Sequence, residues 1–190
     1  SCTDVVCEPA PFVGSGTYFL GVNVFPLDRT DEHPLMIALE IVPEAAGTYT
    51  YSFQPLVSDD VVAEDGSRTP RTTGAREPVG DPIVVEGVTI DANHHFTLTV
   101  NNLRILGDAN PLTGRDILAS ITLDGDYRDS NSACGNVTGQ ATEPISLSLA
   151  PSTFAMRAAS GAPTGLSVVR KCQQGDQVAA PPDVCGPSGE

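Results

Sequence analysis

The 190-residue sequence contains no tryptophan, and only 5% of its residues are aromatic. Basic residues are also scarce: 10 Lys and Arg stand against 24 Asp and Glu, which gives a formal net charge of −14. Because proteins bind nucleic acids through Lys and Arg contacts to phosphate, this charge argues against a nucleic-acid partner. Long apolar runs are missing too, and a helix that crosses a bilayer needs about 20 apolar residues. The sequence therefore predicts no membrane-spanning helix.

Several signatures of catalysis and metal binding are absent as well. No C-x-x-C pair is present, so the sequence predicts no zinc ribbon, thiol redox pair or haem attachment. No G-x-S-x-G motif is present, which argues against a serine hydrolase of that type. His94 and His95 are adjacent, and neighbouring residues of an unbroken strand point to opposite faces, so they would not ligate one metal together. We expect no cofactor and no catalytic activity, with calcium as the one candidate ion.

The cysteines are few and widely spaced, with turn-like neighbours at several of them: Cys2, Cys7, Cys134, Cys172 and Cys185. This spacing favours disulfides over a metal cluster. Disulfides persist in oxidising compartments, so we expect an extracytoplasmic protein that is either secreted or anchored to the outer membrane.

An odd number of cysteines leaves one outside any set of pairs. Ser1 precedes Cys2, and bacterial lipoprotein signal peptides end on a small residue before a cysteine that becomes lipid-modified. We therefore expect Cys2 to be the lipidation site, which leaves four cysteines and three ways to pair them. We favour Cys172 with Cys185 and Cys7 with Cys134. The alternative pairs Cys2 with Cys7 and leaves Cys134 as a free thiol.

Apolar residues recur at every second position along most of the chain. The clearest case is residues 48–54, where Tyr49, Tyr51 and Phe53 alternate with polar residues. Such alternation predicts a strand with one buried and one solvated face, as in antiparallel sheets. Residues 17–25, 35–42, 83–90, 95–100, 117–123 and 145–149 are similar, Phe154 and Met156 begin a further candidate strand, and residues 166–170 are a short one. Asn101-Asn102 predicts a bulge. We predict an all-β fold, a single antiparallel β-sandwich or flattened barrel of about eight or nine strands, stapled by disulfides.

The same pattern suggests three regions. Residues 1–16 are expected to form an N-terminal tether, and residues 17–171 the β-domain. Residues 172–190 form a Pro/Gly-rich C-terminal segment that a disulfide would hold. Within the β-domain, residues 65–82 are polar, rich in Gly and Pro, and predicted to be one long loop.

Two clusters of oxygen-bearing side chains are candidates for calcium. Asp124, Asp126 and Asp129 follow one another at the end of a predicted strand, and calcium prefers carboxylate oxygens. The alternative is a solvated hairpin turn, which Asp-Gly strongly favours. Asp108 and Asn110 begin like an EF-hand loop, but the following residues do not continue the pattern, so we predict a turn stabilised by these side chains.

Three segments have a familiar order: residues 107–117 (GDANPLTGRDI), residues 133–139 (ACGNVTG) and residues 152–155 (STFA). They resemble a poorly characterised group of exported bacterial lipoproteins, in which AN-P-(I/L)-T-G-x-D-I precedes C-G-x-V-T-G and a later S-T-F. The resemblance covers about 50 residues, and its motifs are turns and strand edges. It implies export and lipid attachment at Cys2, and it implies no activity.

These observations lead to one functional hypothesis and two alternatives. We expect a non-enzymatic surface binding or structural module, with a membrane partner through the lipid, an unknown protein or surface partner, and self-assembly as a further prospect. The first alternative is a lipocalin-like carrier whose barrel interior, lined by Tyr49, Tyr51 and Phe53, holds a small apolar ligand. The second is an extracellular hydrolase that uses carboxylates.

Overall fold

The alternating apolar residues form the wall of a barrel. The structure is a computed structural model, and it describes residues 15–30 and 32–172. Eight antiparallel strands lie in the order β6-β3-β2-β1-β11-β9-β8-β7 around the wall. Their bounds are β1 (Gly16–Asn23), β2 (Leu35–Pro43), β3 (Thr48–Pro55), β6 (Ile83–Thr89), β7 (His95–Ile105), β8 (Ile117–Asp129), β9 (Ser132–Glu143) and β11 (Ser152–Ala158). The predicted all-β fold is confirmed, in its barrel form.

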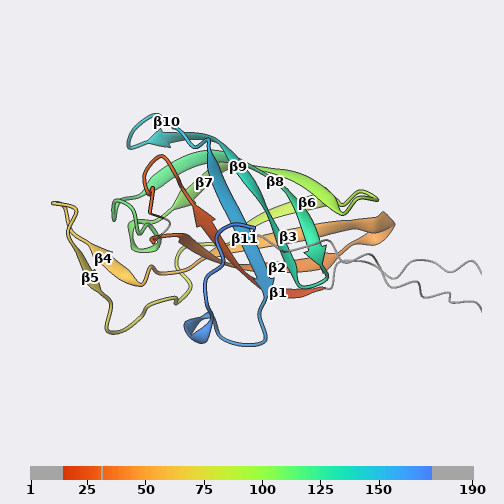
Figure 1. The fold of residues 1–190 in the computed structure, drawn as a ribbon, viewed down its shortest axis with the longest axis horizontal. Coiled ribbons are helices and arrows are strands. Elements are labelled where there is room, and N and C mark those ends of the chain that lie inside the picture. The colour runs from red at the N-terminus through yellow and green to blue at the C-terminus, as the bar shows by residue number, and fades with distance from the viewer. Residues whose placement is uncertain (1–14, 31, 173–190) are drawn as a thin grey trace, which may run out of the picture.

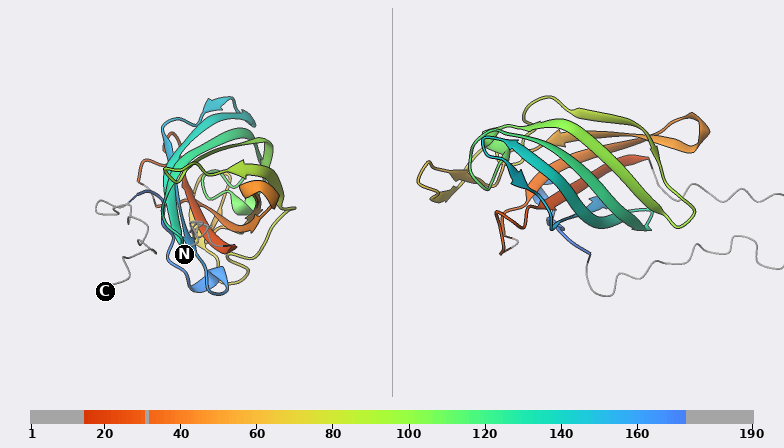
Figure 2. Two further views of the ribbon diagram at one scale, coloured as in Figure 1. Left: turned by 90° about the vertical axis from the view of Figure 1, so that its right-hand side faces the viewer. Right: turned by 90° about the horizontal axis from the view of Figure 1, so that it is seen from above.

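The barrel is nearly closed. Its two end strands, β6 and β7, follow each other in the chain and lie side by side, but no backbone ladder joins them. We call this boundary the seam. The end-on view in Figure 2 shows the ring of strands around the interior. The predicted bulge is confirmed on β7, where the pairing with β8 shifts between Val100 and Leu103 and Asn102 has a φ of 54°.

Several short elements lie outside the ring. β10 (Leu147–Ser148) pairs with β9, and β4 (Asp60–Val62) pairs with β5 (Arg68–Pro70) in a separate hairpin that extends from one end of the barrel (Figure 1). Three single-turn 3-10 helices are η1 (Ala45–Gly47), η2 (Gly107–Ala109) and η3 (Pro163–Gly165). The prediction of one long loop over residues 65–82 was wrong at β5, because its sequence, Arg-Thr-Pro, has no apolar alternation to reveal a strand.

Inward-facing side chains fill the barrel. Tyr49, Tyr51 and Phe53 are all buried on the inner face of β3, as their spacing predicted. Phe96 lies between the rings of Tyr51 and Tyr127, with centroid separations of 6.0 and 5.3 Å. The hydroxyl oxygens of Tyr51 and Tyr127 are 2.6 Å apart, so a hydrogen bond and ring contacts through Phe96 connect the two sides of the seam. Burial raises the pKa of both hydroxyls.

The chain after β11 returns across the outside of the barrel. We call residues 159–172 the strap. Leu166 and Val168 of the strap pack on a second apolar cluster formed by Phe19, Met36 and Leu56. The strap passes so close to β1 that a Cβ on Gly21 would lie 2.5 Å from the carbonyl oxygen of Val169, which explains a glycine there. Because of this outer cluster, β1 is buried on both faces: Leu20 faces the barrel interior and Phe19 lies under the strap.

A disulfide ends the strap. Cys134 of β9 is bonded to Cys172, with their Cα atoms 5.4 Å apart. The predicted pairs, Cys172 with Cys185 and Cys7 with Cys134, are therefore wrong, and so is the alternative with a free Cys134. The strap crosses β1 and β11 to reach β9, and this path brings together two cysteines that are 38 residues apart. Cys2, Cys7 and Cys185 lie outside the described residues, as does most of the predicted tether.

Arg76 fastens the strap to the loop before β6. Its guanidinium donates to the carbonyl oxygens of Pro163 and Leu166, at 2.8 and 2.6 Å, and forms a two-point ion pair with Asp59. It also lies 5.4 Å from the centre of the Phe19 ring. Within residues 15–30 and 32–172, the structure contains no helix long and apolar enough to cross a membrane.

Candidate functional site

An apolar groove lies at the end of the barrel from which the β4–β5 hairpin extends. Its volume is about 450 Å³. The hairpin forms one wall, the segment between η2 and β8 forms the floor, and the end of β9 with β10 forms the other wall. The apolar side chains that line it are Leu27, Val62, Ala63, Leu112, Ile117, Ala141, Pro144, Ile145 and Leu147. We call this feature the end groove.

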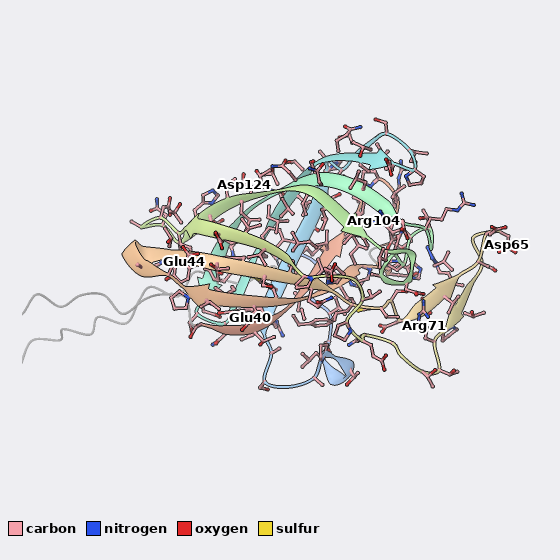
Figure 3. The ribbon with its side chains drawn as sticks, turned by 180° about the vertical axis from the view of Figure 1, so that it is seen from behind. Glu40, Glu44, Asp65, Arg71, Arg104 and Asp124 are labelled. Atoms are coloured by element: carbon pink, nitrogen blue, oxygen red, sulfur yellow. A yellow bond between two sulfur atoms is a disulfide. The ribbon has the colours of Figure 1, made fainter. Side chains whose placement is uncertain are left out.

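Two arginines hold the hairpin in place. Arg68 donates to the carbonyl oxygen of Pro111 at 2.8 Å, and Arg71 forms an ion pair of 2.7 Å with Asp108. Figure 3 shows Arg71 at the base of the hairpin and Asp65 at its tip. A two-stranded ribbon is at best marginally stable alone, so these contacts keep the wall of the end groove in position.

Close backbone packing joins the hairpin to the floor. Gly114 has a φ of +64°, and a Cβ at this residue would lie 2.6 Å from the carbonyl oxygen of Val62. Any other residue would therefore be strained and would push the hairpin away from the floor. The position of the hairpin wall thus depends on a glycine in the segment that precedes β8.

Asn110 organises the floor. Its side chain is fully buried, and its amide nitrogen donates to Thr113 Oγ1 and to the carbonyl oxygen of Arg115, both at 2.7 Å. Its amide oxygen accepts from the backbone N–H of Leu112 at 3.0 Å. The predicted side-chain-stabilised turn is confirmed at Asn110, while Asp108 binds Arg71. The loop is a structural support for the end groove.

Charged side chains surround the mouth of the end groove. Glu64, Asp65, Glu143 and Arg115 all line it and are all exposed. None of these four forms an ion pair within the described ranges. Hydrogen bonds from the Ser67 side chain and backbone hold the pKa of Asp65 below its ordinary value. The mouth therefore carries three acidic groups and one basic group.

The predicted calcium ligands are only partly brought together. Asp124 and Asp126 lie on the outer face of β8, and both approach the ring of His95 on β7, with Asp126 Oδ1 2.9 Å from Nδ1 and Asp124 Oδ1 3.0 Å from Nε2. The hydrogen bond with Asp126, followed by the charges of Asp124, Asp126 and Asp91, raises the pKa of His95. These two carboxylates hold an imidazole where the sequence analysis placed an ion.

The third predicted ligand has a different role. Asp129 Oδ1 accepts hydrogen bonds from the backbone N–H of Asn131 at 2.7 Å and from Ser132 Oγ at 3.0 Å, in the turn between β8 and β9. No group of three or more His, Cys, Asp or Glu side chains suited to a metal is found in residues 15–30 and 32–172. The three predicted carboxylates therefore do not converge, because Asp124 and Asp126 contact His95 whereas Asp129 bonds within the turn between β8 and β9.

The segments that carried the family resemblance have structural roles. Asp116 accepts hydrogen bonds from the backbone N–H of Gly107 and from Arg104, at 2.9 and 2.8 Å, and so closes the loop that Asn110 fills. Cys134 forms the disulfide, and Phe154 is fully buried in the barrel. These residues shape and close the barrel.

Sequence reasoning missed the end groove. Its apolar residues come from separate segments: Val62 and Ala63 lie before the hairpin turn, whereas Ile117 and Ile145 begin two of the predicted alternating runs. The available signal was the presence of these apolar residues in polar, turn-rich surroundings. Only the fold shows that they face one another.

Comparisons with known proteins concern the fold. No protein-family model and no curated protein matches the chain. Among solved structures, a redesigned beta barrel is similar, with 13% sequence identity, a TM-score of 0.39, and coverage of 81% of this chain and 97% of that chain. This similarity concerns barrel architecture and says nothing of function.

Proposed function

We propose that this chain is an extracytoplasmic surface-binding module, tethered by a lipid at Cys2, that holds an apolar ligand in the end groove and catalyses no reaction. The observation that carries the proposal is the end groove itself. Its volume of about 450 Å³ falls within the range of small-ligand pockets, roughly 300–1,000 Å³. Its lining is mainly apolar with a few polar groups at the mouth, which is the usual character of such pockets.

The barrel interior offers a ligand far less room. The cavity between Leu20, Phe53 and Leu123 has a volume of only about 10 Å³. That is space for about one water molecule. The carrier alternative requires an apolar ligand inside the barrel, where the aromatic cluster of Tyr51, Phe96 and Tyr127 is already packed. The end groove is thus the better place for an apolar ligand.

The environment of the acidic residues favours a binding role over hydrolysis. Within the part of the chain that the structure describes, Asp28 is the one buried carboxylate. Burial alone would raise the pKa of Asp28, but hydrogen bonds from Thr30 and from the His33 backbone outweigh it and lower the pKa. A general acid would need the opposite shift. Asp28 instead stabilises the loop between β1 and β2.

The location and the tether rest on separate arguments. The Cys134–Cys172 disulfide supports an oxidising compartment, since such bonds are rare in the cytosol. The lipid at Cys2 rests on the resemblance to exported lipoproteins. We expect the Cys2 peptide of membrane-extracted protein to carry acyl chains in mass spectrometry, and the Cys2→Ala variant to move to the soluble fraction. Unmodified Cys2 in membrane-extracted protein would rule out the tether.

Binding in the end groove can be tested with Nile red, a neutral dye that fluoresces in apolar surroundings. We expect the purified chain to bind the dye and the Ile145→Glu variant to bind it at least tenfold more weakly. Val84→Glu is the matched control: Val84 lies on β6, outside the groove, and its exposure is 54% against 58% for Ile145. Equal dye affinity in the two variants would refute the proposal.

A further inference from the structure

The end groove has a charge asymmetry that its apolar lining alone does not require. Three exposed carboxylates, those of Glu64, Asp65 and Glu143, line its mouth, and Arg115 is the one basic side chain there. None of the four is in an ion pair within the described ranges, although Glu143 lies close enough to Arg104 for its charge to help raise the pKa of that side chain. The mouth thus has an excess of two negative charges.

The acidic groups come from both walls of the groove. Glu64 and Asp65 stand at the tip of the β4–β5 hairpin, and Glu143 ends β9 on the other side. A molecule whose apolar part lies against Leu112 and Ile145 would have its exposed end between these two walls. A positive group at that end would be attracted from both sides while it remains in contact with water.

The field of the whole chain acts in the same direction. A net charge of −14 attracts cations and repels anions, and a groove with low-dielectric walls concentrates that field. An apolar anion, such as a fatty acid, would have to approach against both the overall charge and the mouth. The charge pattern therefore favours a positively charged ligand over a negatively charged one.

We infer that the ligand of the end groove is a small amphipathic cation, an alkylammonium-type molecule with its chain in the groove and its positive head between Glu64, Asp65 and Glu143. This inference rests on the proposed function and adds the chemical class of the ligand. Arg115 opposes the head group, so the selectivity reflects the balance of the four charges.

Three ligands with the same eight-carbon chain separate the apolar and electrostatic contributions: octylammonium, octanol and octanoate. Each is used to displace Nile red from the full chain at low salt. We expect octylammonium to bind about fivefold to tenfold more tightly than octanol, and octanoate to bind more weakly than both. The preference should shrink in 1 M salt, where the screening length falls from about 10 Å at 0.1 M to about 3 Å.

Charge-neutral variants then test the named residues. We expect Glu64→Gln/Glu143→Gln to reduce octylammonium affinity about fivefold and to leave octanol and Nile red affinity unchanged. Glu40→Gln/Glu86→Gln is the matched control, because it removes the same charge from exposed positions outside the groove. Arg115→Gln should strengthen octylammonium binding.

The possible results distinguish failure of the cation inference from failure of the proposed binding function. If octanol displaces Nile red but octanoate binds as tightly as octylammonium, the end groove binds apolar ligands and the cation inference is wrong. Equal losses of octylammonium affinity in the groove and control double variants would also overturn it. If Nile red does not bind, or Ile145→Glu has no effect on its binding, the proposed function itself fails.

Discussion

Tyr51 on β3 and Tyr127 on β8 share a hydrogen bond of 2.6 Å between their hydroxyl oxygens inside the barrel. These strands flank β6 and β7, the pair that meets at the seam without a backbone ladder. The barrel is thus joined at this point by side chains: one hydrogen bond, and the ring of Phe96 packed against both tyrosines. This relationship makes the closure of the barrel open to direct test.

Removing the second of these two hydroxyls should cost much less than removing the first. In Tyr127→Phe, the buried hydroxyl of Tyr51 loses its bond, and we expect a loss of about 1–2 kcal/mol in the free energy of unfolding. Adding Tyr51→Phe removes that buried polar group and should cost little more, or recover part of the loss. Urea unfolding of the two single variants and the double variant measures this coupling. Strictly additive losses would show that the two hydroxyls do not depend on each other.

Alkaline pH should weaken the fold through the same pair. Burial raises the pKa of Tyr51 and Tyr127 above the ordinary value near 10. The unfolded chain therefore releases these protons first, so their contribution is complete below about pH 10 and is lost as pH rises toward the folded-state pKa. We expect a lower denaturation midpoint at pH 11 than at pH 8, with a smaller drop in the Tyr51→Phe/Tyr127→Phe variant. If the midpoint fell equally in both proteins, the loss of stability at high pH would come from groups other than these two tyrosines.

The disulfide should contribute most of the strap's attachment. Cys134 and Cys172 are 38 residues apart, and a loop of that length corresponds to about 4 kcal/mol in the chain-entropy model. We expect Cys134→Ala/Cys172→Ala to approach that loss in urea unfolding and to speed hydrogen exchange in residues 166–172. Thr153→Val removes one hydrogen bond from β11 to Arg170 and should cost only about 1 kcal/mol. Unchanged exchange in the strap would contradict its dependence on the disulfide.

Asn110 should be the most sensitive polar residue near the end groove. Its removal in Asn110→Ala leaves the buried N–H of Leu112 and the carbonyl of Arg115 without their side-chain partner, so we expect a loss of about 2–4 kcal/mol. The floor should also lose its shape, and Nile red affinity should fall. Asn101→Ala, at an exposed position on β7, is the control and should be near neutral. If Asn110→Ala bound Nile red as tightly as the unchanged protein, the shape of the end groove would not depend on the turn that Asn110 stabilises.

His95 should titrate above its ordinary pKa. Its hydrogen bond with Asp126 is the main cause and the charge of Asp124 a lesser one, so Asp126→Asn should lower the pKa more than Asp124→Asn. Because the folded-state pKa is raised, the stabilisation from protonated His95 is complete below about pH 6.5 and is lost as pH rises through the folded-state value. NMR titration of the His95 ring measures both variants. Equal shifts would contradict the ranking of the two carboxylates.

Alternation along the chain was enough to predict most of the wall strands and their faces, but it did not predict β9 or the β4–β5 hairpin. The inward positions of Tyr49, Tyr51 and Phe53 follow from a period of two, which is a property of a single strand and its nearest neighbours in sequence. The bulge at Asn102 follows from a local break in that period. The turn at Asn110 follows from a side chain that bonds to the next few residues. Each of these features depends on a short stretch of sequence.

Contacts between distant segments were decided by the tertiary structure. Alternation fits a sandwich as well as a barrel, and the choice depends on β6 reaching β7 and on the aromatic residues that fill the interior between Tyr51 and Tyr127. The pairing of Cys134 with Cys172 depends on the path of the strap across the barrel, and the spacing of cysteines in the sequence does not reveal that path. The end groove unites residues from a hairpin, a floor and a strand end that are far apart in the chain. Local sequence sets which face of a strand is apolar, whereas packing of the whole chain decides what that face meets.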